Sequence, residues 1–240
     1  MSEIKIATCS LMQGSNAQSR QIQGSHAKPF TLGKVNDGNE IVHCLALLKE
    51  ALPEDEYRKV LVLFLRLYAR AKETAKHSAR VCIISSNIGY RCNLSFEQSR
   101  DLSVSALLHD TGKVKLSDEI LVGKTPLSSS QKAQIKKHPE NGAALIVESG
   151  LLNAESIVEI VIGHHERIDG QGYPNGLGGS EIPLLARIIS VADTFDAMTD
   201  SDRGYRKPLD KTSAQQKLWE ARIEQLDCSV VKEFLSIEDL

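Results

Sequence analysis

Two adjacent histidines, His164 and His165, stand between an apolar run that ends at Ile162 and a glycine-rich loop. Side chains one residue apart on a helix point about 100° away from each other. Two imidazoles placed in this way can reach into one cavity and serve two different centres. The pair is therefore the first indication of a site that holds more than one metal ion.

Further histidines and two aspartates extend this indication. His77, His109 and His138 lie on separate helix-like segments, Asp110 follows His109 directly, and Asp193 ends an apolar run. Imidazole together with carboxylate is the ligand set of iron, manganese or zinc in a partly open site. Each residue alone is more simply interpreted as buried and hydrogen-bonded to a neighbour. The whole set favours a metal site, because an aspartate in an apolar run needs a partner or a metal.

Three other polar features have a functional and a simpler interpretation. Glu73 and His77 have the i, i+4 spacing that puts both on one helix face, where they could be two ligands or a solvated pair. Lys113 could bind phosphate or donate a proton, or it could be an exposed lysine at a helix C-terminus. The basic stretch 203–207, around Tyr205, could clamp phosphates or form a solvated turn.

The composition limits the possible partners and the cellular setting. The formal net charge of the 240 residues is -2, so we expect no binding to DNA or RNA. The 5 cysteines are scattered without a CxxC motif, which argues against disulfides and for a reducing, cytoplasmic setting. The first residues lack the apolar core of a signal peptide, and the most apolar segment, Val60–Leu65, is too short to cross a membrane. We expect a cytoplasmic protein with no membrane contact.

The pattern of elements predicts an all-α fold, because neither repeats nor strand-like alternation appear. We expect a polar arm and a short helical segment over residues 1–52, and one catalytic domain over residues 53–240. Pro53 and the acids after it predict a helix that runs to Ile88 and is stopped by Gly89. Ser95 with Gln98 predicts a capped helix that leads to His109. Further helices are expected near 128–138, 139–146, 151–165, 182–198, 212–219 and 228–235.

The chain contains a series of short motifs, namely His109-Asp110 with Gly112-Lys113, His138-Pro139, His164-His165-Glu166, Asp169-Gly170, Gly172-Tyr173-Pro174 and Val191-Ala192-Asp193. Together these motifs resemble the HD-GYP family, a branch of the HD phosphohydrolases. The similarity runs from about Ala71 to Leu235, and it is most specific between His164 and Met198. It implies an HD-type helical bundle with two or three divalent metal ions in its core, usually iron, with manganese as the alternative. It also implies hydrolysis of cyclic di-GMP to pGpG and on to GMP by a metal-activated water.

The resemblance also implies a role for individual residues. Lys113 would act beside the scissile phosphate, Tyr173 would mark the substrate loop, and Arg203 and Arg206 would grip the substrate phosphates. Gly204 stands where the family has proline, and one extra residue precedes Arg203, so the phosphate grip departs from the family pattern. The metal ligands implied are His77, His109, Asp110, His138, His164, His165 and Asp193, with Glu73 for a third metal and Asp110 bridging.

Two other functions remain compatible with the residues. The chain could be a module that senses a dinucleotide with little turnover. It could also hydrolyse another cyclic dinucleotide, such as cyclic GMP-AMP. The sequence does not distinguish between these bases. Under any of these functions, a signalling protein or a second copy of the chain could be a partner.

Overall fold

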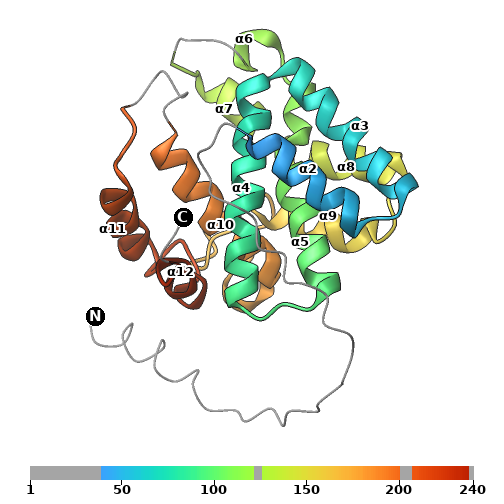
Figure 1. The fold of residues 1–240 in the computed structure, drawn as a ribbon. Helices are drawn as coiled ribbons and strands as arrows, with labels where there is room; N and C mark the ends of the chain where they lie inside the picture. The colour runs from blue at the N-terminus through green and yellow to red at the C-terminus, as the bar shows by residue number, and fades with distance from the viewer. Residues whose placement is uncertain (1–38, 122–125, 201–206, 238–240) are drawn as a thin grey trace.

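The computed structural model describes residues 39–121, 126–200 and 207–237, and Figure 1 shows their arrangement. Within these ranges the elements are helices, so the all-α prediction is confirmed. The helices are α2 (Glu40–Ala51), α3 (Glu54–Arg70), α4 (Lys72–Arg91), α5 (Phe96–Leu108), η1 (Thr111–Lys115), α6 (Asp118–Leu121), α7 (Ser129–Ile135), α8 (His138–Ser149), α9 (Ala154–Gly163), η2 (Gly179–Glu181), α10 (Leu184–Thr199), α11 (Lys211–Ala221) and α12 (Cys228–Leu235).

Helix α4 is the centre of the bundle (Figure 1). It packs against α2, α3, α5, α10 and α12. Ile83, Ile84 and Ile88 on α4 are completely buried, and burying an isoleucine side chain stabilises a fold by about 1.5–3 kcal/mol. Because α4 also carries His77, the site is attached to the best-packed element of the molecule.

The single helix expected from Pro53 to Ile88 is wrong, because the structure has two helices there. The backbone turns at Ala71, where φ is -150° and ψ is 78°, so α3 ends and α4 begins in a new direction. Gly89 does not stop α4, which continues to Arg91. A Cβ atom on Gly89 would lie 2.8 Å from the Leu102 side chain, so this glycine instead allows α5 to approach closely.

The expected helix starts are confirmed where a cap was identified. Ser95 and Gln98 form the expected reciprocal capping box at α5, and the helix expected from residue 128 also begins with a capping box, made by Ser128 and Gln131 at α7. Pro53 immediately precedes α3, and α12 spans the expected residues. These local hydrogen bonds satisfy backbone groups that a helix end leaves without partners.

The short helix α2 joins the same core as the rest of the bundle, since Cys44 and Leu48 are fully buried. The division of the chain at residue 53 stays a prediction. Among the described residues, no helix combines the length and the apolar character that a membrane crossing requires.

Candidate metal centre

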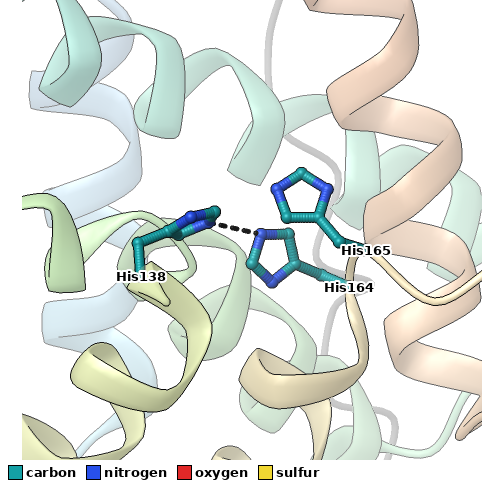
Figure 2. A group of neighbouring side chains, drawn as sticks. All are labelled: His138, His164 and His165. Carbon is teal, nitrogen blue, oxygen red and sulfur yellow. Dashed lines mark hydrogen bonds between the residues drawn. The ribbon is translucent and has the colours of Figure 1, made fainter. Parts of the chain in front are cut away.

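The ends of several helices bring histidines and aspartates into one buried cluster. His77 comes from α4, His109 and Asp110 follow α5, and Asp193 lies on α10. His138 opens α8, and the two adjacent histidines follow α9 (Figure 2). Three groups have donor atoms within 4.8 Å of one another: His138, His164 and His165; His77, His109 and Asp193; and His109, Asp110 and His164. All seven predicted ligands of the central cluster therefore lie together.

Three of the imidazoles are oriented by their own backbone. The Nδ1 atoms of His109, His138 and His164 lie 2.8, 2.8 and 2.6 Å from carbonyl oxygens three residues earlier. A carbonyl only accepts, so each Nδ1 must carry the proton and donate it. Each Nε2 is then left with a lone pair that points into the cluster.

The Nε2 lone pairs of these histidines point toward one another, and no proton lies between them. The Nε2 atoms of His138 and His164 are 3.2 Å apart (Figure 2), and with both Nδ1 atoms protonated neither can donate to the other. The Nε2 atom of His138 is also 3.2 Å from a carboxylate oxygen of Asp110. The Nε2 atom of His109 is buried with no hydrogen-bond partner in the described part of the chain. A cation among these atoms would remove the conflict, and the donor set fits iron, manganese or zinc.

The electrostatics of the cluster keep most imidazoles neutral. Burial lowers the pKa of His138 to about 3 and that of His165 to about 4, and it also lowers the pKa of His109. Burial and the neighbouring His165 hold the pKa of His164 well below its usual range. Burial alone would raise the pKa of Asp110, but the positive charge of Lys113 and the imidazoles keep it well below its usual range. Neutral imidazoles and ionised carboxylates are the forms that bind metals.

His77 is oriented in a different way from the other ligands. Its Nδ1 atom lies 2.6 Å from a carboxylate oxygen of Asp196, and its Nε2 atom lies 3.0 Å from Asp193. Burial lowers the pKa of His77, but the hydrogen bonds to these two aspartates outweigh it and raise the pKa to about 9. Asp196 is in turn bound by Arg80 through two hydrogen bonds of 2.7 and 3.0 Å.

Sequence reasoning gave Asp196 and Arg80 no role. The spacing contains a signal for both, because Asp196 follows Asp193 by three residues and Arg80 follows His77 by three residues. Residues three apart share one side of a helix. Each of these pairs therefore combines a predicted ligand with a residue that can support it.

The rings of the two adjacent histidines lie close to each other just beyond the end of a helix. Helix α9 ends at Gly163, and the rings of His164 and His165 lie 4.1 Å apart at an interplanar angle of 40°. Both belong to the group with His138, while His164 also belongs to the group with His109 and Asp110. The role of the pair in serving two centres stays a prediction.

Of the other predicted site residues, two lie beside the cluster and the rest lie apart from it or outside the described residues. Lys113 lies at the edge of the cluster, with its Nζ atom 2.6 Å from Asp110. The Tyr173 ring stacks on the His165 ring with centroids 4.8 Å apart. The carboxylate of Glu73 is half-exposed and forms an ion pair with Lys76, outside the three groups. Arg203 and Arg206 lie outside the described residues.

Glu166 shapes the glycine-rich loop beside the cluster. Its buried carboxylate accepts backbone N–H bonds from Asn175 at 2.7 Å and from Leu177 at 3.0 Å. The sequence motif includes Glu166, but its structural role is visible only in the fold. The carboxylate ties the far side of the loop to the end of α9, and so it holds the segment that presents Tyr173 against His165.

Comparison with known proteins places this architecture in a family. A family model described as HD domain matches residues 65–230. A cyclic di-GMP phosphodiesterase of Pseudomonas aeruginosa is 35% identical over 160 residues, which cover 67% of this chain and 38% of that protein. A 3′3′-cGAMP-specific phosphodiesterase of Vibrio cholerae is 33% identical over 150 residues, which cover 62% of this chain and 28% of that protein. The chain thus spans well under half the length of these relatives.

A solved structure agrees at the level of the fold. An HD-GYP-type protein from Bdellovibrio bacteriovorus superposes with a TM-score of 0.57 at 19% sequence identity, covering 83% of this chain and 65% of that one. The HD domain family model, which matches residues 65–230, spans more than half of the chain and includes all seven clustered ligands. The chain belongs to the HD domain family, and its predicted resemblance to the HD-GYP branch is confirmed.

Proposed function

We propose that the chain is a metal-dependent phosphodiesterase that hydrolyses cyclic di-GMP to pGpG, to GMP, or to both. The observation that carries this proposal is the convergence of unprotonated imidazole nitrogens and two carboxylates in one buried cluster beside Lys113. The name of the Pseudomonas aeruginosa relative supports the substrate class. Two or three divalent ions, with iron expected and manganese as the alternative, would complete the site.

The ligands fall into overlapping groups that suit more than one ion. His138, His164 and His165 would hold one metal, and His77, His109 and Asp193 would hold another. Asp110 lies between them, because its carboxylate is 3.2 Å from the Nε2 atom of His138 and 3.5 Å from that of His109. When bound, the metals would polarise the phosphate and lower the pKa of a water molecule.

Lys113 is the protein's own cation at the reacting phosphate in this proposal. Its ammonium group contacts Asp110 and is partly exposed, so it can reach a ligand at the edge of the cluster. It would neutralise negative charge on the phosphoryl oxygens. It is also placed to give a proton to the leaving oxygen, as general acid catalysis requires.

Tyr173 would form one wall of the substrate site. Its ring stacks on His165, and the ammonium of Lys136 lies 5.1 Å from the centre of the same ring. This arrangement offers an aromatic surface beside a positive charge, which suits a nucleotide base linked to a phosphate. The phosphate contacts of Arg203 and Arg206 remain part of the proposal from the family resemblance alone, as does a third metal at Glu73.

A second substrate, 3′3′-cyclic GMP-AMP, is favoured by one specific observation. The Vibrio cholerae relative named for that substrate is 33% identical, close to the 35% of the relative named for cyclic di-GMP. Both substrates have the same phosphodiester chemistry, so the metal cluster serves either one. The choice depends on contacts with the bases.

The test is product analysis with protein purified without oxygen and loaded with Fe(II) or Mn(II). Cyclic di-GMP and 3′3′-cyclic GMP-AMP are supplied separately, and nucleotides are separated by chromatography. We expect linear products that disappear after chelation and fall at least about 100-fold in Lys113→Gln, as for loss of a group that stabilises transition-state charge. Lys115→Gln is the matched control, because Lys115 is exposed on the same short helix. Tight binding without any product would instead support the sensing function.

A further inference from the structure

His77 differs from neighbouring ligands of the cluster in the kind of group that orients its ring. His109, His138 and His164 each use a main-chain carbonyl, which is neutral. His77 uses the carboxylate of Asp196, which is an anion. This difference separates the two sides of the cluster, since His77 belongs to the group with His109 and Asp193 and not to the group with His138 and His165.

The Asp196 carboxylate is itself held on both oxygens. Arg80 Nε binds Oδ1 at 2.7 Å and an Nη atom binds Oδ2 at 3.0 Å, the same oxygen that receives His77. The same guanidinium contacts Asp200 at 2.8 Å, so it links the last turn of α10 to α4. Asp196 and the Asp200 carboxylate are almost fully buried, and a bidentate arginine fixes a carboxylate more rigidly than a lysine could.

We infer that Asp196 and Arg80 are positioning residues that make the His77, His109 and Asp193 side of the cluster the tighter of its metal sites. This inference depends on the proposed metal centre. A carboxylate that accepts the second N–H of a metal-binding histidine fixes the ring and strengthens its other nitrogen as a ligand. Neither Asp196 nor Arg80 needs to touch metal or substrate to have this effect. The main-chain carbonyls on the other side orient their rings without adding a negative charge.

The inference predicts an unequal effect of one substitution on two binding steps. Asp196→Asn keeps the size of the side chain but removes its charge and breaks one of its bonds to Arg80. Metal binding at the His77 side should weaken about 10–100-fold, the usual effect of losing such a partner. Binding at the His138 side should stay within about twofold.

The experiment is a titration of metal-free protein with Mn(II) in competition with a chelator, together with visible spectra of the Co(II)-loaded protein. We expect two resolved metal-binding steps in the wild-type protein. Asp196→Asn should weaken only the tighter step and alter the Co(II) spectrum of that site. Asp227→Asn is the matched control, because Asp227 also pairs with an arginine, Arg187, but caps α12 outside the cluster. It should leave both steps and both spectra unchanged.

Arg80→Lys keeps the test valid if Asp196→Asn does not fold. An ammonium retains the charge but cannot make the paired bonds, so in Arg80→Lys the tighter step should weaken by a few-fold while the weaker step stays within about twofold. Equal weakening of both steps, or no weakening in either variant, would overturn the inference. Absence of any metal binding by the unchanged protein would instead overturn the proposed function, so the two failures are distinguishable.

Discussion

Replacing Gly112 with alanine should separate the two segments that carry Asp110 and His138. Gly112 lies in η1, directly against the first turn of α8. A Cβ atom at this position would be 2.0 Å from the carbonyl oxygen of His138 and 2.4 Å from the backbone nitrogen of Gly142. Both are main-chain atoms, so no side-chain rotation can make room. Ordinary contact begins at 3.4 Å, which means that η1 and α8 must move apart by about 1.4 Å.

A displacement of this size is large for a metal site. The Nε2 atom of His138 lies 3.2 Å from Asp110, and these two residues are on opposite sides of the Gly112 contact. Metal–ligand distances are fixed to about 0.2 Å, and a misplacement of about 1 Å can lower a catalytic rate about 100-fold. We therefore expect Gly112→Ala to lose at least about 100-fold in phosphodiesterase activity and to bind less metal. Overpacking should also lower the free energy of unfolding by about 1–3 kcal/mol.

Three measurements on Gly112→Ala check this reasoning: urea unfolding, metal content and turnover. Gly178→Ala is the matched control, because its new Cβ atom would be 3.5 Å from the nearest atom and its φ of -126° suits any residue. That variant should keep the stability and the metal content of the unchanged protein. If Gly112→Ala kept them as well, the close packing of η1 on α8 and its role in assembling the ligands would both be refuted.

Three further predictions concern the cluster and the loop beside it. Asp110→Ala should lose both bound metal and turnover, and a variant with full activity would refute the ligand assignment. Glu166→Gln replaces a charged acceptor of two backbone N–H bonds, so urea unfolding should show a loss of about 1.5–3 kcal/mol; a loss below about 0.5 kcal/mol would contradict the loop anchor. In metal-free protein, the melting temperature should fall as the pH drops from about 6.5 towards 4, because unfolded histidines bind protons there. In the folded protein these histidines stay unprotonated over this range, since the pKa of His138 is about 3 and that of His165 about 4. His77 has the opposite effect: its pKa of about 9 adds stability that is lost as the pH rises through that value. A melting temperature constant between pH 4 and 6.5 would show that these imidazoles are not buried in a neutral form.

The sequence predicted the helices that have local signals and the ligands that have a characteristic chemistry. Ser95 with Gln98 marks a helix start because the capping bonds are made between residues three apart. His109 and Asp110 were recognisable as part of a larger set of histidines and aspartates in apolar contexts, because imidazole with carboxylate is a characteristic ligand set of metal ions. The turn at Ala71 was not predictable, because nothing in the neighbouring residues breaks a helix. It is fixed by contacts far along the chain, such as the bond from Arg70 to the carbonyl of Leu116.

The supporting residues of the site were harder to predict than its ligands. Asp196 and Arg80 are more than a hundred residues apart in the chain, and their bond exists only after α4 packs against α10. The role of Glu166 likewise depends on the return of the loop to the end of α9. A ligand is identified by its own chemistry, whereas a supporting residue is identified by its neighbour, which the fold must supply.

The use of main-chain carbonyls to orient three imidazoles affects which substitutions the site can tolerate. Every amino acid has a carbonyl, so Ala106, Ile135 and Val161 can be exchanged for residues of similar volume while the orientation of the histidines is retained. The orientation of His77 has no such protection, because it depends on one side chain that a single nucleotide change can replace.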